Sequence, residues 1–303
     1  MQAIRHLERA DPTEFRLHHA EASRPAVIRD GFRYWPRAAA WSIEKLAERF
    51  RHRTLPAYET GGRVDLAEQL GKISASKSDD PEPYIRNINI ITELPELLAD
   101  FSPTIPLCVP NRIGSPLLPA RLFPQNGHLL ELFVGGPGSQ FPYVHYDDPV
   151  MHTWSLLLQG SKEWTLFAPS DGGYLYPKED VPFHSRITDV DTVDLERFPL
   201  FEKATPIKHV QKPGELLYVP AGWWHTARNL DASLTVAWDQ LCRSNWKAYC
   251  DYVQFVEKNI GRLQASMTYL YLRCMGPILT GYEFLFEQEG KEPFWMAQRT
   301  KDH

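Results

Sequence analysis

Tyr143-Val144-His145-Tyr146-Asp147-Asp148 is the stretch that decides the fold, together with the distant Gly222-Trp223-Trp224-His225-Thr226. Side chains two apart on an extended strand point to the same side, so His145 and Asp147 present an imidazole and a carboxylate together. If the strand that carries His225 packs beside them, two histidines and a carboxylate share one face of an octahedral ion. We therefore predict a metal site of the kind found in non-haem Fe(II) oxygenases.

Two other histidines compete for the third ligand position. His184 lies in a long polar segment, and His209 lies in a strand without aromatic neighbours. His225 instead follows Pro220-Ala221-Gly222-Trp223-Trp224, a turn that is expected to place it among apolar side chains. We favour His225, and three unrelated roles for the two histidines and the aspartate remain the alternative.

The sequence pattern around these motifs is typical of an all-β barrel or sandwich. From Gly127 onward, short apolar runs alternate with turn residues. The expected strands cover residues 129–134, a stretch from His145 onward, and residues 153–158, 163–167, 207–210, 216–219 and 234–238. Gln159-Gly160-Ser161-Lys162 is interpreted as a tight hairpin turn. Upstream, the alternation in residues 84–90 predicts a strand with Tyr84, Arg86 and Ile88 on one face.

The flanking segments are predicted to contain helices. Ser42 is expected to cap a helix over residues 43–50, and Asp65 a second helix through Leu70. After Cys242 the pattern becomes helical, and Gly276-Pro277 is expected to divide the last helices. The predicted domains are an N-terminal α/β buttress (1–83), the barrel (84–241) and a C-terminal helical segment (242–303).

Composition limits the partners and the compartment. A formal net charge of -5 gives no electrostatic reason to expect nucleic acid or an anionic membrane as partner. The four cysteines lack the spacing of a zinc knuckle or a disulfide scaffold, so reduced thiols in a cytoplasm fit best. No apolar run approaches the roughly 20 residues of a membrane span, so we expect a cytoplasmic protein.

Three phrases carry a resemblance to a known family: Tyr-Val-His-Tyr-Asp (143–147), Gln-Gly-Ser-Lys-Glu-Trp-Thr-Leu-Phe-Ala-Pro-Ser-Asp (159–171) and Pro-Gly-Glu-Leu-Leu-Tyr-Val-Pro-Ala-Gly-Trp-Trp-His (213–225). They resemble the JmjC family of Fe(II)- and 2-oxoglutarate-dependent oxygenases. Within it, the chain is most similar to the cupin-like hydroxylase branch typified by the asparaginyl hydroxylase that inhibits hypoxia-inducible factor. The similarity is continuous from about Tyr84 to Trp238.

The resemblance implies a double-stranded β-helix (jelly-roll, cupin) core with N-terminal α/β additions and a C-terminal helical segment. It also implies two cofactors, Fe(II) and 2-oxoglutarate, with release of succinate and CO2 as a substrate C–H bond is hydroxylated. The family's metal ligands fall on His145, Asp147 and His225, and these are the predicted catalytic residues.

The resemblance also assigns the cosubstrate and substrate sides of the pocket. The lysine of the family's Gly-x-Lys turn falls on Lys162, which would hold the distal carboxylate of 2-oxoglutarate, and a tyrosine on the same carboxylate falls on Tyr84. A surface hairpin lysine and a plain core aromatic are the alternatives. Arg86 and Trp238 are expected on the substrate side.

Two positions depart from the family pattern. A threonine or serine that touches 2-oxoglutarate is often found three residues before the first ligand, where this chain has Pro142. We expect Thr153 or Ser155 to supply the missing hydroxyl. An asparagine often found after the third ligand is replaced by Ala237.

The predicted function is hydroxylation of a protein or peptide side chain or of a small metabolite. Two alternatives stay open: a JmjC-like binding module without turnover, and a metal-dependent cupin enzyme that does not use 2-oxoglutarate. By family analogy, the apolar C-terminal segment is expected to form a homodimer contact.

Overall fold

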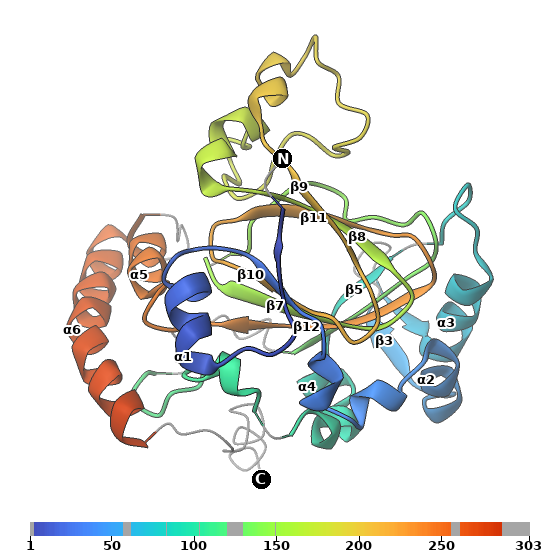
Figure 1. The fold of residues 1–303 in the computed structure, drawn as a ribbon, viewed down its shortest axis with the longest axis horizontal. Helices are drawn as coiled ribbons and strands as arrows, with labels where there is room; N and C mark the ends of the chain where they lie inside the picture. The colour runs from blue at the N-terminus through green and yellow to red at the C-terminus, as the bar shows by residue number, and fades with distance from the viewer. Residues whose placement is uncertain are drawn as a thin grey trace.

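The computed structural model describes residues 3–56, 62–82, 84–102, 104–119, 130–148, 150–255 and 261–286. Its centre is a pair of mainly antiparallel sheets (Figure 1). The larger sheet contains, in spatial order, β1 (Arg5–Leu7), β2 (Ala26–Ile28), β10 (Leu216–Val219), β7 (His152–Gln159), β12 (Ser233–Gln240), β6 (Glu131–Gly135) and β5 (Ile85–Asn89). The smaller sheet contains β11 (Trp224–Asn229), β8 (Lys162–Phe167) and β9 (Ile207–Gln211). One cavity is lined from both sheets, so the sheets face each other as in the predicted double-stranded β-helix.

Strand β12 shows how the larger sheet separates core from cavity. Leu234, Val236 and Trp238 belong to the main hydrophobic cluster. The alternate residues Thr235 and Ala237 line the cavity between the sheets. This follows from the two-residue period of a strand, which sends successive side chains to opposite faces. The neighbouring β7 repeats the pattern, so polar side chains of both strands meet inside the barrel.

The outer face of the larger sheet is covered by the N-terminal residues. The predicted caps are confirmed: Ser42 Oγ accepts from the Lys45 amide at the start of one helix, and Asp65 accepts from the Glu68 amide at the start of the next. The α-helices of this half are α1 (Pro12–Phe15), α2 (Ile43–Arg49), α3 (Leu66–Ala75) and α4 (Ile90–Glu93), and β3 (Thr54–Pro56) pairs with β4 (Arg63–Asp65). Since β1 and β2 join the larger sheet, the predicted N-terminal buttress also supplies strands to it.

Strand β5 departs from the predicted alternation. Its register against β6 shifts between Ile85 and Ile88, and Asn87 adopts a left-handed backbone with φ 57°. Such a bulge inserts a residue and turns the following side chains over. Arg86 and Asn87 both line the cavity, whereas Ile88 packs in the main cluster. The prediction that Tyr84, Arg86 and Ile88 share a face was therefore wrong for Ile88.

The predicted hairpin at residues 159–162 was also wrong. Strand β7 pairs with β10 and β12, whereas β8 pairs with β11 and β9. The turn has the expected glycine, with Gly160 at φ +82°, but it carries the chain from one sheet to the other. Local turn chemistry predicts the turn and leaves open which strands it joins.

The C-terminal segment forms two helices, α5 (Trp246–Phe255) and α6 (Arg262–Phe286), which lie along one side of the barrel (Figure 1). Helix α6 runs through Gly276-Pro277, where the sequence predicted a break. Packing explains the difference, because the Trp246 ring fills the space that a side chain at Gly276 would take. Thr280 Oγ1 also donates to the Gly276 carbonyl (3.0 Å). Among the described residues, no helix is long and apolar enough to cross a membrane.

The excursion between β8 and β9 has its own small core. It contains the 3-10 helices η7 (Pro169–Leu175) and η8 (Pro199–Lys203). Leu175, Ile187 and Phe198 pack with Val144 and Trp224. These contacts hold the excursion beside the predicted metal ligands. His225 lies in β11, whereas His145 lies in isolated bridges to His184 and His225 and Asp147 lies outside the strands, so the expected strand from His145 onward is not formed. The remaining short helices in the described residues are η1 (Arg16–Ala20), η2 (Gly31–Arg33), η3 (Ala38–Ala40), η4 (Pro95–Phe101) and η5 (Pro106–Cys108).

Candidate active site

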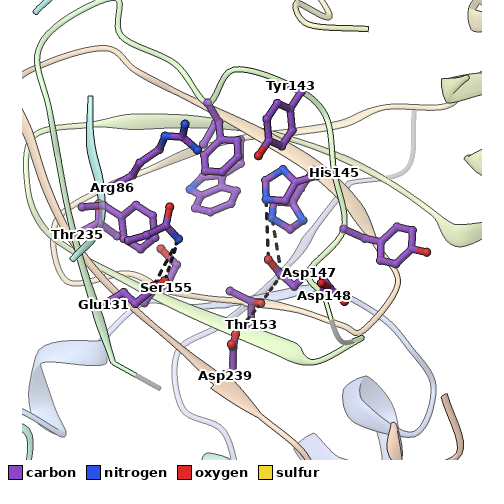
Figure 2. A pocket seen from close by; sticks show the side chains of 18 of the residues that line it. Arg86, Glu131, Tyr143, His145, Asp147, Asp148, Thr153, Ser155, Thr235 and Asp239 are labelled. Atoms are coloured by element: carbon purple, nitrogen blue, oxygen red, sulfur yellow. Dashed lines mark hydrogen bonds and ion pairs between the residues drawn. The ribbon is translucent and has the colours of Figure 1, made fainter. Parts of the chain in front are cut away.

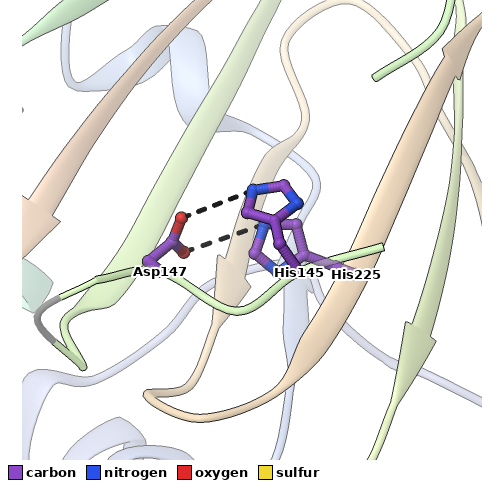
Figure 3. A group of neighbouring side chains, drawn as sticks. All are labelled: His145, Asp147 and His225. Carbon is purple, nitrogen blue, oxygen red and sulfur yellow. Dashed lines mark ion pairs between the residues drawn. The ribbon is translucent and has the colours of Figure 1, made fainter. Parts of the chain in front are cut away.

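His145, Asp147 and His225 come together as the sequence predicted (Figure 3). The backbones of His145 and His225 exchange two hydrogen bonds, of 3.0 and 2.6 Å, which place the two imidazoles side by side. Asp147 Oδ1 lies 3.8 Å from His145 Nε2, and Asp147 Oδ2 lies 3.8 Å from His225 Nε2. One donor atom from each residue falls within 4.8 Å of the others, which is a spacing that a single divalent ion can close.

The two imidazoles are prepared to act as neutral ligands. His225 Nδ1 lies 3.1 Å from the Trp223 carbonyl oxygen. A carbonyl can only accept, so Nδ1 carries a proton, and Nε2 is the nitrogen that would bind an ion through its lone pair. At His145, burial and the neighbouring His225 and His184 hold the pKa well below its ordinary value. An unprotonated nitrogen is what a metal requires.

The competing histidines occupy different places. His184 lines the cavity, and its ring lies 4.0 Å from Tyr143 and 6.4 Å from His145, between centroids. Within the described part of the chain, it does not join the group of ligand atoms at metal-binding distance. His209 instead contacts Glu215 (3.0 Å) and does not line the cavity.

The cavity beside the triad has a volume of about 390 Å³ (Figure 2). The buried side chain of Lys162 also lines it. Lys162 is only 2% exposed, and its Nζ donates to the Tyr84 hydroxyl at 2.8 Å. Burial lowers the pKa of Lys162 to about 7. Lys162 is therefore not the surface lysine of the alternative. An anion bound beside it would favour the charged ammonium and raise its pKa again.

Two buried hydroxyls in the same cavity have no hydrogen-bond partner in the described chain: Ser155 Oγ and Thr235 Oγ1. Their side chains are 0% and 2% exposed. Ser155 was predicted from the sequence, whereas Thr235 was missed. Its signal was the alternation along β12, which places it on the same face as Ala237. Pro142 is not among the described residues that line the cavity, so hydroxyls come from β7 and β12 instead.

Thr153 also lines the cavity, but its hydroxyl is already engaged. Its Oγ1 donates to Asp147 Oδ2, and Asp239 Oδ1 lies 3.4 Å away on the other side. Figure 2 shows Thr153 between the two carboxylates. A hydroxyl has one proton, so the predicted donation from Thr153 to a cosubstrate carboxylate competes with the bond to Asp147.

The two predicted substrate-side residues differ in position. Arg86 lines the cavity with its guanidinium 5.1 Å from the centroid of Phe141, whose ring stacks on His145 at 4.2 Å. The ring of Trp238 lies in the core, 4.7 Å from Trp35 between centroids, although the residue also contributes to the cavity wall. Strand alternation turns this ring away from the cavity face, so a direct ring contact with substrate is not what the geometry favours.

Residues 12–242 match the family described as the cupin-like domain. The match covers most of the chain, including the smaller sheet, every strand of the larger sheet except β1, and the triad. The chain belongs to the cupin-like domain family. The fold of this cupin-like protein agrees with the family match, because the matched range contains the barrel strands from β5 to β12.

Several curated proteins are similar to this cupin-like chain. Mouse (Mus musculus) tRNA wybutosine-synthesizing protein 5 is 28% identical over 67% of this chain and 61% of its own length. Lysine-specific demethylase 8 of Xenopus tropicalis is 24% identical over 74% of this chain and 49% of its own length. Lysine-specific demethylase JMJ21 of Arabidopsis thaliana is 24% identical over 76% of this chain and 24% of its own length. The chain therefore spans between about a quarter and three-fifths of the length of these relatives.

Proposed function

We propose that this protein is an Fe(II)- and 2-oxoglutarate-dependent dioxygenase that hydroxylates a C–H bond of a protein or peptide side chain or of a small metabolite. The observation that carries the proposal is one cavity lined by two groups. One is the two-histidine, one-carboxylate group, and the other is a buried lysine that donates a hydrogen bond to a tyrosine. The family and the names of the relatives support an oxygenase-type enzyme.

The residues fit both cofactors. Two neutral imidazoles and a carboxylate suit Fe(II) and leave coordination positions for other ligands. The Lys162 ammonium and the Tyr84 hydroxyl offer charge and a hydrogen bond to one carboxylate of a dianion. Ser155 Oγ and Thr235 Oγ1 are buried donors that a carboxylate would satisfy. An unpaired buried hydroxyl costs about 1–3 kcal/mol, so such an anion would remove a cost as well as add bonds.

When bound, iron and 2-oxoglutarate together supply the activation of O2 and the oxidising power. The chain itself provides binding, orientation and exclusion of water. Lys162 and Tyr84 would hold the distal carboxylate of 2-oxoglutarate and so orient the cosubstrate in the cavity, and His145, Asp147 and His225 would hold the iron. Phe133 and Trp164 border Lys162 at 5.9 and 6.0 Å from its Nζ to their centroids. These rings keep water from the ammonium and strengthen its attraction to an anion.

The first test is anaerobic titration of 2-oxoglutarate into the Fe(II)-loaded protein, followed in the visible range for the absorption of a bidentate chelate. We expect the band in wild-type protein and in Lys208→Met, a control at an exposed lysine of β9. His145→Ala should lose iron, and Lys162→Met should keep iron but require far more 2-oxoglutarate. A wild-type protein that binds iron but gives no band would refute cosubstrate use.

Turnover separates the remaining alternatives. Purified enzyme with Fe(II), ascorbate, O2 and cell extract should release succinate, and labelled O2 should place one oxygen atom in a product detectable by mass spectrometry. A binding module would form the chelate band without succinate release. A cupin enzyme that does not use 2-oxoglutarate would lose activity in His145→Ala and keep it in Lys162→Met. Fractionating the extract into protein, RNA and small molecules would show which class is modified.

A further inference from the structure

We propose that Thr153 is a positioning residue that holds Asp147 as a ligand through one oxygen, so that a coordination position stays open for the cosubstrate. This inference rests on the proposed metal site. It concerns a different question, namely how a carboxylate with two similar oxygens is prevented from using both. A carboxylate can bind an ion through one oxygen or through two, and the second mode would occupy a position that the reaction needs.

The two oxygens of Asp147 are placed almost symmetrically toward the imidazoles. Oδ1 lies 3.8 Å from His145 Nε2, and Oδ2 lies 3.8 Å from His225 Nε2. The histidines alone therefore do not distinguish the oxygens. The difference comes from Thr153, whose hydroxyl donates to Oδ2 only. That bond engages a lone pair of Oδ2 and leaves Oδ1 as the better ligand.

The threonine is itself held in place. It lies on β7, paired with Val219 of β10 and Asp239 of β12, and its side chain is on the cavity face. Its residue exposure is 8%. Thr153 has one hydroxyl proton and two nearby carboxylates, Asp147 and Asp239 Oδ1 at 3.4 Å. The bond to Asp147 is the shorter of the two, so the proton is assigned there.

The side-chain type matters as much as the position. A β-branched side chain in a strand has few rotamers, so the hydroxyl direction is fixed by the backbone. Groups that orient metal ligands in this way typically contribute ten- to hundredfold to metal affinity. A hydroxyl is also neutral, so it does not compete with Asp147 for the ion as a carboxylate at this position would.

The test uses Co(II) in place of iron, because its visible absorption reports coordination number and is stable in air. Wild-type protein, Thr153→Val, Thr153→Ser and Thr226→Val are each titrated with Co(II), and spectra are recorded with and without 2-oxoglutarate. Thr226 is a matched control, because it is also 8% exposed and adjoins His225 without contacting Asp147 in the described chain. Circular dichroism of the metal-free proteins checks that each variant is folded.

We expect Thr153→Val to bind Co(II) about ten- to hundredfold more weakly, to show a changed spectrum and to bind 2-oxoglutarate less tightly. Thr153→Ser keeps the hydroxyl but not the β-branch that orients it, so it should restore these three properties in part, and Thr226→Val should match wild type. If folded Thr153→Val has the wild-type spectrum and affinity, or if Thr226→Val changes as much, the positioning role is refuted while the metal site stands. If wild-type protein binds no Co(II), both the proposed function and this role fall.

Discussion

Replacing Lys162 with methionine is expected to make the folded protein more stable while removing most of its affinity for 2-oxoglutarate. The lysine is 2% exposed, and burial lowers its pKa from 10.5 to about 7. Between these values the unfolded chain holds the proton and the folded chain does not, so folding releases it. The stability of wild-type protein should therefore rise as pH increases from about 7 to 10.5.

The magnitude follows from the same shift. One pKa unit corresponds to about 1.36 kcal/mol, so the buried ammonium costs about 5 kcal/mol at pH 6, where it is charged in both states. Methionine removes this cost but loses the hydrogen bond to Tyr84, which contributes about 1 kcal/mol. Lys162→Met should be about 3–4 kcal/mol more stable than wild type at pH 6 and about 1 kcal/mol more stable at pH 9.

The assay is urea denaturation of both proteins at pH 6 and pH 9, without metal or cosubstrate. Lys208→Met is the control, because hydrogen bonding to Asp191 raises the pKa of Lys208 and its loss should destabilise slightly. A Lys162→Met protein less stable than wild type at pH 6, or a difference that does not shrink as pH rises, would refute the reasoning. Binding of 2-oxoglutarate to wild type should offset the cost by mass action.

Three further results are expected. Thr235→Val should raise the dissociation constant for 2-oxoglutarate about ten- to hundredfold, as calorimetry would measure, since a bond to a charged acceptor contributes about 1.5–3 kcal/mol. Co(II) at 100 times its dissociation constant should stabilise the protein by about 2.7 kcal/mol in thermal unfolding, an effect lost in His225→Ala and kept in His209→Ala. Leu270 is 63% exposed on α6, so Leu270→Glu should turn a dimer into a monomer by light scattering, while Leu200→Glu should not; a wild-type monomer would contradict this.

The triad and the helix caps could be predicted because their determinants are local. His145 and Asp147 are two residues apart, and Ser42 and Asp65 act within three residues of their own positions. The spacing identified the two ligands, although His145 lies only in isolated bridges and Asp147 lies outside the strands. The prediction of His225 as the third ligand also used the aromatic turn that precedes it in the sequence. The backbone bridge between His225 and His145 confirms that the two residues lie together.

What the sequence did not predict depends on partners distant along the chain. At Asn87 the pairing of β5 with β6 shifts register, and this bulge sends the side chain of Ile88 to the face opposite that of Arg86. The turn at Gly160 joined two sheets, although its residues suit a hairpin equally well. The sequence predicted that the Thr153 hydroxyl contacts a cosubstrate and did not predict its hydrogen bond to Asp147. Residue spacing does not show which of several acceptors a hydroxyl donates to.

The cavity concentrates features that oppose folding. Lys162 carries a desolvated charge, and His145 Nδ1, Ser155 Oγ and Thr235 Oγ1 are buried without partners among the described residues. Each unpaired polar atom costs about 1–3 kcal/mol, and a domain with a net stability of about 5–15 kcal/mol can carry few of them. The grouping of Lys162, Ser155 and Thr235 in one cavity is what a ligand-binding site requires, because one bound anion would satisfy these three groups together. Measuring stability with and without 2-oxoglutarate therefore tests the site without knowledge of the substrate.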